Sequence, residues 1–468
     1  MNIYKIYKEE ETMEREKLSS RLGFILLSAG CATGCGNVWK FPTMTGSNGG
    51  GAFVLIYLIF LVIIGLPVMC MEFAVGRASK KSPARAYHVL TPDKKPWRAH
   101  GYLSLLGNVV LCMFYTVVSG WMLYYFIAFV KGDFVGVSTL QQTQNLFATI
   151  TETPAIIIGS TLAIIILGFF ICSFRLDKGL EKVTKYMMVA LLLIMIVLAI
   201  YSFTLSGAKE GLTFYLIPDF TKINLDVVVA AIKQAFFTLS LGIGSMAIFG
   251  SYIDDSRSLL SEASTVIALD TFVAIVAGLI IFPTCFTYGV QVDGGPALIF
   301  HTLPLVFANL TGGRIIGSLF FLFMTFAAFS TILAVFENIV ACIREMFDME
   351  RNKACIICGI GMVVLSMPCA LSFCTFGTGF GVLNIEDFIV SNLLLPAGSL
   401  TYIVYCTQKF GWGWDNFVAE VNKGTGLKLG NKVKLYVAYI LPAIVLALLI
   451  IGLFTFNYKG DIIDLFTK

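Results

Sequence analysis

The chain has 468 residues, of which 57% are hydrophobic and 13% are charged, and its net charge is +4. Soluble domains carry about 25% charged residues, so this composition excludes a soluble globular fold, and the small net charge gives no case for nucleic-acid binding. Many apolar runs reach the ~20 residues that a helix needs to cross a lipid bilayer. We therefore expect one large helical membrane domain in contact with lipid.

Eleven apolar runs follow a polar stretch, 1–20, which lacks the apolar core of a signal peptide and in which Met13 is a candidate start. The short apolar stretch 296–310 predicts a re-entrant or surface helix, and 411–430 predicts an interfacial loop. The runs predict an all-α integral membrane protein with about eleven transmembrane helices, at residues 22–46, 51–77, 101–130, 154–173, 180–206, 229–253, 258–290, 313–348, 354–373, 385–408 and 433–456.

Basic residues concentrate in the N-terminal segment and in alternate loops, and the opposite loops hold few of them. The basic loops are 77–98, 175–185, 344–353 and 409–434. Because loops rich in lysine and arginine stay on the cytoplasmic side, we expect a cell (inner) membrane protein with a cytoplasmic N-terminal segment, 1–20. Eleven crossings then leave the C-terminus outside.

The first and sixth apolar runs are interrupted by residues that disfavour a helix. The first contains AGCATGCGNVWKFP, from Ala29 to Pro42, and the sixth contains TLSLGIG, from Thr238 to Gly244. Paired interruptions of this kind indicate a transporter with discontinuous helices and inverted repeats. Close helix packing through glycine is the alternative. We predict a first five-helix repeat at 21–206, a second, inverted five-helix repeat at 229–410, and an eleventh helix with the C-terminal tail at 411–468.

Four further polar side chains lie within apolar runs. Asp270 lies in TVIALDTFVAIVAG, where an unpaired charge costs at least about 2.5 kcal/mol, and Glu72 lies near the end of the second run. Ser330 and Thr331 form a hydroxyl pair in the eighth run. Such a pair either bonds to the preceding helical turn or contributes to a cation site.

Longer motifs surround these residues: RLGFILLSAG, GNVWKFP and NGGGAF near the start, and QAFFTLSLGIG in the sixth run. In these motifs the chain resembles the neurotransmitter:sodium symporter family, and within it the bacterial, leucine-transporter-like amino-acid branch, from about Glu14 to about residue 456. The resemblance implies a symporter that imports an amino acid by alternating access with two sodium ions. The sequence gives no indication of an enzyme, since no nucleophile–base pair or metal motif stands out.

The resemblance also implies two sodium sites, a substrate site and two gates. The first sodium site would use Ala32, Asn37, Thr238 and Asp270, and the second Gly30, Thr33, Ala327, Ser330 and Thr331. The substrate site would use Ala32, Cys35, Gly36, Leu111, Tyr115, Phe237, Thr238, Ser240, Ile243, Thr331 and Val335. The extracellular gate would use Lys40 and Asp387, and the intracellular gate Arg15, Glu345 and Tyr252.

The chain departs from the leucine-transporter pattern at positions that bear on specificity. Ile243 replaces a phenylalanine and leaves more room, which favours a bulky apolar or aromatic substrate such as tyrosine, tryptophan or leucine. Lys40 replaces the gate arginine and therefore lacks its bidentate fork, and Leu18 replaces a tryptophan. At Gly34 the family's amine carriers place an aspartate that meets the ligand ammonium, so this glycine argues against an amine substrate.

Asp270 occupies a position that is asparagine in many relatives. Chloride-dependent members hold an anion near the positions of Tyr57, Gln234 and Ser240, and the fixed carboxylate of Asp270 would replace its charge. We therefore predict chloride-independent transport. A transporter fold used as a substrate sensor stays an alternative, and the residues give no signal of an oligomeric state.

Overall fold

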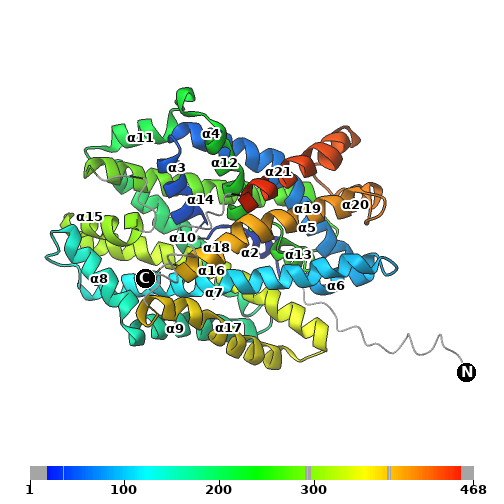
Figure 1. Ribbon diagram of the computed structural model, residues 1–468, viewed down its shortest axis with the longest axis horizontal. Coiled ribbons are helices and arrows are strands. Elements are labelled where there is room, and N and C mark those ends of the chain that lie inside the picture. Colours follow the sequence, from blue (N-terminus) through cyan, green and yellow to red (C-terminus); the bar gives the residue numbers. More distant parts are fainter. Residues whose placement is uncertain are drawn as a thin grey trace, which may run out of the picture.

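The architecture is entirely helical across the part of the chain that the structure describes (Figure 1). The coordinates are a computed structural model. It describes residues 18–34, 36–289, 292, 297–376, 379 and 381–454. The predicted all-α membrane fold is confirmed.

Nine continuous helical stretches in the described ranges are long and apolar enough to cross a membrane. They are Gly51–Ser79 (α4, η2, α5), Lys95–Lys131 (η3, α7), α9 (Pro154–Ser173), α10 (Leu180–Ser202), α14 (Leu259–Thr287), α16 (Gly313–Phe347), α17 (Arg351–Cys374), Gly381–Thr407 (α18, η6, α19) and Asn431–Phe454 (η7, η8, α21). One bent helix pair raises the number of candidate spans in the described ranges to ten. A second helix pair is interrupted as well. α2 (Arg21–Ala32) meets η1 and α3 (Gly36–Ser47) at a bend of 52°, and α12 (Leu225–Thr238) is separated from α13 (Ser245–Gly250) by non-helical backbone.

The break between α12 and α13 rests on unusual backbone torsions. Gly242 has φ +100° and Gly244 has φ +72°, a region that glycine enters without steric cost. Ser240 also lies there, with φ +51°, which is strained for a residue with a Cβ. A carboxylate holds this backbone in place, because Glu72 accepts hydrogen bonds from the amides of Gly242 and Met246. The interruption of the sixth run is therefore confirmed.

Each π-helical segment in the described residues ends two residues before a proline. A proline has no N–H to donate and its ring clashes with the carbonyl of the preceding turn. A π turn widens the helix at that point and accommodates the ring. The segments are η1 (Gly36–Lys40), η2 (Leu61–Gly65), η5 (Leu298–Thr302), η6 (Ile389–Leu394) and η8 (Tyr436–Ile440), which precede Pro42, Pro67, Pro304, Pro396 and Pro442.

Short helices lie at the two ends of the bundle (Figure 1). α6 (Pro83–Leu90) and α20 (Trp414–Val421) lie at one end, in segments expected to be loops. α20 forms because Trp414 and Phe417 are buried, a tertiary contact that local sequence does not encode. The other end carries α8 (Leu140–Glu152), α11 (Ala208–Leu216), η4 (Phe220–Lys222) and α15 (Leu303–Asn309).

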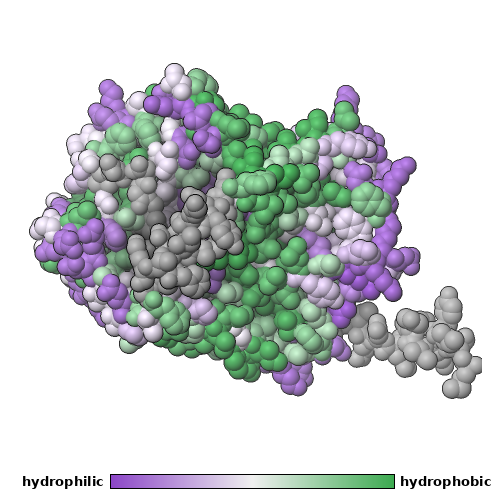
Figure 2. Space-filling view, viewed as in Figure 1, coloured by the Kyte–Doolittle hydropathy of each residue, from purple (hydrophilic) through white to green (hydrophobic). Residues whose placement is uncertain are grey.

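The distribution of hydrophobic side chains on the surface is typical of a protein embedded in a lipid bilayer. Figure 2 shows a band of hydrophobic side chains across the middle of the molecule, with hydrophilic side chains at both ends. Exposed Ile166, Leu193 and Val364 are typical of helices that face lipid tails. α16 is the most central span, since 83% of its apolar window is buried, compared with 33% for the span that contains α21.

Candidate ion and substrate site

Three polar side chains from the two broken spans and α14 meet in the core. The Nδ2 of Asn37 donates to Oδ1 of Asp270 at 2.8 Å and to the Asp270 carbonyl at 2.9 Å. The hydroxyl of Thr238 donates to Oδ1 of Asn37 at 2.5 Å. All three side chains are fully buried. The structure thus joins Asn37, Thr238 and Asp270 as the sequence suggested.

This cluster suits a small hard cation. Asp270 makes no ion pair with a basic side chain in the described ranges. A buried carboxylate without a counter-charge is strongly destabilising, so the site favours a bound cation. Its donor set consists of carboxylate, amide and hydroxyl oxygens, which hard cations prefer. Asn37, Thr238 and Asp270 therefore fit a sodium ion.

A second cluster of oxygens connects α2 with α16. The Ser330 hydroxyl donates to the carbonyls of Gly30 and Ala327, both at 2.9 Å. The Thr331 hydroxyl donates to Gly30 O at 3.1 Å. The buried hydroxyl of Thr33 has no hydrogen-bond partner within the described part of the chain. The oxygens of Gly30, Ala327, Ser330 and Thr331 lie together near the end of α2, and their chemistry also fits sodium.

Between the breaks lies a small cavity of about 20 Å³. A Cβ built on Gly34 would lie 2.2 Å from the Tyr115 hydroxyl and 2.5 Å from the Thr331 hydroxyl. Both hydroxyls therefore face the unwound backbone at Gly34, and a larger residue there would require them to shift. The lining residues are Cys31, Ala32, Gly34, Gly36, Leu111, Tyr115, Phe237, Ser240, Thr331, Val390 and Leu395.

Most of the expected substrate residues line this cavity, and three described ones do not. Thr238 belongs to the first oxygen cluster, and Cys35 lies outside the described residues. Val335 is buried in α16 without lining the cavity. Ile243 does not line it either: a Cβ on Gly107 would lie 2.4 Å from Ile243 Cγ2, so this side chain packs against α7.

Sequence reasoning missed Val390 and Leu395 as lining residues, and it assigned no role to Glu72. Val390 and Leu395 come from the π turn η6 and the start of α19. A regular helical pattern does not place them on one face. The signal for Glu72 was its depth in the second run, but its partners are backbone amides of the sixth span, which no side-chain motif reveals.

An ion pair lies beside Phe237, one of the residues that line the cavity. The Nζ of Lys40 lies 3.0 Å from Oδ1 and 3.1 Å from Oδ2 of Asp387, and it donates to the Ser391 hydroxyl at 3.1 Å. The same ammonium lies 3.7 Å from the centre of the Phe237 ring, which lines the cavity. The two residues expected to form the outer gate are thus in contact.

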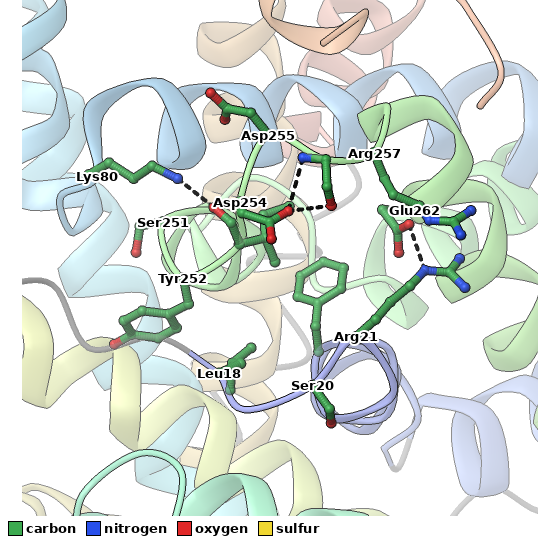
Figure 3. A pocket seen from close by; sticks show the side chains of 13 residues that line it. Leu18, Ser20, Arg21, Lys80, Ser251, Tyr252, Asp254, Asp255, Arg257 and Glu262 are labelled. Carbon is green, nitrogen blue, oxygen red and sulfur yellow. Dashed lines mark hydrogen bonds and ion pairs between the residues drawn. The ribbon is translucent and has the colours of Figure 1, made fainter. Parts of the chain in front are cut away.

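A larger cavity of about 480 Å³ lies near the N-terminal end of α2 and the C-terminal ends of α5 and α13. Figure 3 shows Leu18, Arg21 and Tyr252 around it, and Arg21 pairs with Glu262 at 2.9 Å. Hydrogen bonds from Ser256 hold the pKa of the Asp254 carboxyl, also on this cavity, below its ordinary value.

Arg15, one of the three residues expected to form the intracellular gate, lies outside the described residues. Tyr252 donates to Oε1 of Glu337 at 2.7 Å. The Glu345 carboxylate accepts from the amide and hydroxyl of Ser82, both at 2.8 Å. The structure thus shows Tyr252 beside the large cavity, whereas the contacts of the Glu345 side chain include Ser82, the N-cap residue of α6.

Comparison with known proteins identifies the family. The model of the sodium:neurotransmitter symporter family matches residues 15–135 and 136–461. The chain is 33% identical over 413 residues to the "Uncharacterized sodium-dependent transporter YhdH" of Bacillus subtilis, covering 87% of this chain and 90% of that protein. It is 33% identical over 467 residues to the "Uncharacterized sodium-dependent transporter MJ1319" of Methanocaldococcus jannaschii, covering 96% and 93%.

A solved structure agrees with these relatives. The structure described as "MhsT in complex with L-phenylalanine" matches with a TM-score of 0.85 and 35% identity, covering 94% of this chain and all of that one. Relatives named as sodium-dependent transporters match nearly the whole chain, and none of these findings points to an enzyme. The chain belongs to the sodium:neurotransmitter symporter family, whose members are sodium-dependent membrane transporters.

Proposed function

We propose that this protein imports an amino acid with a bulky apolar or aromatic side chain, such as tyrosine, tryptophan or leucine, together with two sodium ions and without chloride. The main support for an amino-acid substrate is the cavity between the breaks, where the hydroxyls of Tyr115 and Thr331 face unwound backbone at Gly34. The apolar residues Leu111 and Phe237 line the same space. The phenylalanine in the MhsT structure supports this class of substrate.

The carboxylate and the ammonium group of the substrate would bind to residues of the broken spans and of α7. The Tyr115 hydroxyl and the amides at the start of η1, at Gly36, would bind the carboxylate, because free amides at a helix start attract anions. Carbonyls near Phe237 and the Ser240 hydroxyl would bind the ammonium. The apolar lining would then hold the side chain.

The two oxygen clusters would each hold one sodium ion. Ala32 O, Asn37, Thr238 and Asp270 would bind the first ion. The carbonyls of Gly30, Thr33 and Ala327 and the hydroxyls of Ser330 and Thr331 would bind the second. Each ion that moves inward through 100 mV releases about 2.3 kcal/mol, and a tenfold solute gradient takes about 1.4 kcal/mol. Two ions therefore support about thousandfold accumulation of a zwitterion.

Chloride independence follows from the charge at Asp270. The carboxylate is buried and bonded to Asn37. It would provide the negative charge that an anion provides elsewhere in the family. The side-chain Nε2 of Gln234 donates a hydrogen bond to the Gly36 carbonyl at 2.9 Å. Complete loss of uptake in chloride-free medium would contradict this part of the proposal.

Transport would proceed by alternating access in the inner membrane, with the N-terminal segment cytoplasmic and the C-terminus outside. The repeats 21–206 and 229–410 would contribute the moving spans. The Lys40–Asp387 pair would close the outer side, while the 480 Å³ cavity would lie on the release route.

Uptake of labelled amino acids into proteoliposomes tests the proposal. We expect accumulation of one bulky apolar or aromatic amino acid only with an inward sodium gradient, and its loss in Asn37→Ala. Asn145→Ala is the matched control, because Asn145 is exposed on α8. Sodium-dependent binding without accumulation would instead favour a sensor.

A further inference from the structure

The helical stretch Gly381–Thr407 contributes two side chains to the cavity. Val390 is 0% exposed and Leu395 is 2% exposed, although only 44% of the apolar window of this span is buried. Both line the cavity. With Leu111 and Phe237 they are its large apolar lining residues, so half of these come from a helix that the sequence did not assign to the substrate site.

The π turn η6 explains why these two side chains share one face. The Leu395 amide donates to the Val390 carbonyl, five residues earlier. In a regular α-helix, residues five apart lie roughly 140° apart around the axis. The wider π turn, with its i→i+5 hydrogen bond, brings them close to one face. Pro396 follows at once and is the local reason for the π turn.

Close backbone packing fixes this face against the broken sixth span. A Cβ on Gly242 would lie 2.2 Å from the Leu395 carbonyl, and a Cβ on Gly398 would lie 2.0 Å from the Gly242 carbonyl. The two backbones are therefore in direct contact. Ser240, two residues before Gly242, lines the cavity. Val390 and Leu395 thus hold a set position relative to the polar part of the site.

We propose that Val390 and Leu395 are specificity-determining residues that set the size of the amino-acid side chain that the protein carries. This inference rests on the proposed function. Ile243, which the sequence suggested for that role, instead packs on Gly107. The Tyr115 and Thr331 hydroxyls face the backbone at Gly34, so they are placed for the substrate's own backbone groups.

Competition experiments with alanine, leucine, phenylalanine and tryptophan test the inference. A hydrophobic pocket discriminates between substrates that differ by one methylene by about 10–200-fold, so a change in the size of the pocket wall should alter this preference. We expect Val390→Ala and Leu395→Ala to shift the tryptophan-to-leucine preference by about tenfold toward tryptophan. Val390→Ile, which adds a methylene and preserves the fold more easily, is expected to shift it toward smaller side chains.

Ile389→Ala is the matched control, since Ile389 lies on the same π turn and does not line the cavity. Unchanged preference in both alanine variants and in Val390→Ile, with uptake retained, would overturn the inference. A shift confined to Ile243→Ala would overturn it equally and assign the role to that residue. Absence of sodium-dependent uptake in the unmodified protein would overturn the proposed function itself.

Discussion

The ammonium of Lys40 lies 3.7 Å from the centre of the Phe237 ring. A cation over an aromatic face is stabilised by the ring quadrupole. Because Phe237 also lines the cavity, this contact couples the Lys40–Asp387 pair to the position of one side chain of the cavity wall. An apolar substrate that holds the ring in place would therefore favour the paired state.

A double-mutant cycle tests whether Lys40 and Asp387 act as a unit. We expect Lys40→Ala and Asp387→Ala each to slow sodium-driven uptake, and the double variant to be no slower than either single one. The pair is partly exposed, at 30% and 32%, so the coupling should be modest, about 0.5–1 kcal/mol. Initial uptake rates measure it. Strictly additive losses would show that the two residues do not act together.

Gly34→Ala should abolish or strongly weaken substrate binding. The added Cβ would lie 2.2 Å from the Tyr115 hydroxyl and 2.5 Å from the Thr331 hydroxyl, closer than atoms pack. Both hydroxyls would have to move away from the cavity. Substrate-induced thermal stabilisation of the purified protein measures the loss.

Gly159→Ala is the control for Gly34→Ala. Gly159 lies in α9, and nothing lies within 4 Å of its built Cβ. Alanine favours a helix over glycine by about 1 kcal/mol, so this variant should keep binding and lose no stability. Equal effects of both substitutions would exclude a local role for Gly34.

Asp270→Asn should weaken the stabilisation that sodium gives. The neutral amide keeps the shape of the side chain but removes the charge that compensates a bound cation. We expect a smaller sodium-dependent rise in Tm and uptake that chloride now stimulates. Asp226→Asn, an exposed carboxylate on α12, is the control. An unchanged sodium response would remove Asp270 from the first sodium site.

The residues themselves were sufficient to predict the breaks, and the family resemblance named the members of the two oxygen clusters. Glycines and Asn37 in an apolar run disfavour a helix, and the backbone groups that they free must find partners at membrane depth. The run itself therefore predicts the break. Asp270 is recognised in the same way, because its charge is too costly in lipid without a function. These features can be recognised in one segment, without knowing which other segments pack against it.

The remaining features depend on contacts between distant segments. Val390 and Leu395 share a face only because of a π turn before Pro396, and helical periodicity predicts otherwise. Ile243 packs on Gly107 because the broken sixth span lies against α7 at that point. α20 exists because its apolar side chains are buried against the bundle. The contacts of Ile243 and of α20 have no signature within their own segments, whereas the π turn has one in Pro396 that helical periodicity does not take into account.

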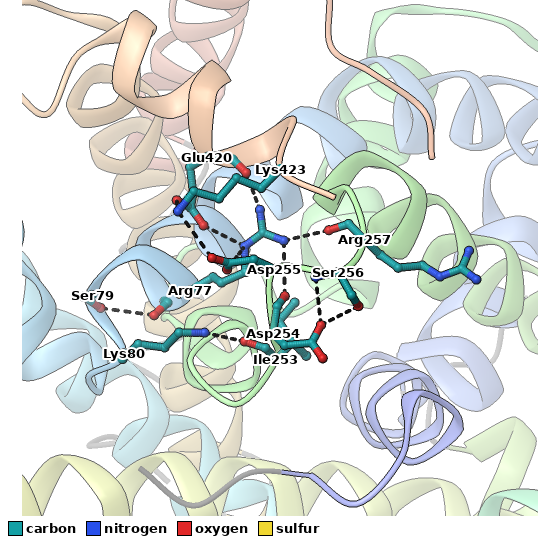
Figure 4. A network of polar contacts seen from close by, with 11 residues as sticks. Arg77, Ser79, Lys80, Ile253, Asp254, Asp255, Ser256, Arg257, Glu420 and Lys423 are labelled. Carbon is teal, nitrogen blue, oxygen red and sulfur yellow. Dashed lines mark hydrogen bonds and ion pairs between the residues drawn. The ribbon is translucent and has the colours of Figure 1, made fainter. Parts of the chain in front are cut away.

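Arg77 and Lys423 both bind Glu420, and they should differ in importance (Figure 4). Nε of Arg77 lies 2.6 Å from the Glu420 carboxylate with its side chain 0% exposed, whereas Lys423 lies 2.7 Å from it and is 45% exposed. Arg77 also donates to the Arg257 carbonyl at 2.7 Å. It therefore connects α5 with α20 and with the loop after α13.

We expect Arg77→Met to lower the stability of the purified protein by about 3–5 kcal/mol, because it removes the buried counter-charge of Glu420 and leaves this carboxylate only the half-exposed Lys423. Lys423→Met should cost no more than about 1 kcal/mol, because exposed pairs are screened by solvent. Thermal unfolding in detergent measures the stability of both variants relative to the unmodified protein. If the two variants unfold at the same temperature, burial of the Arg77 pair does not decide the strength of this connection, and α20 is held by its apolar contacts alone.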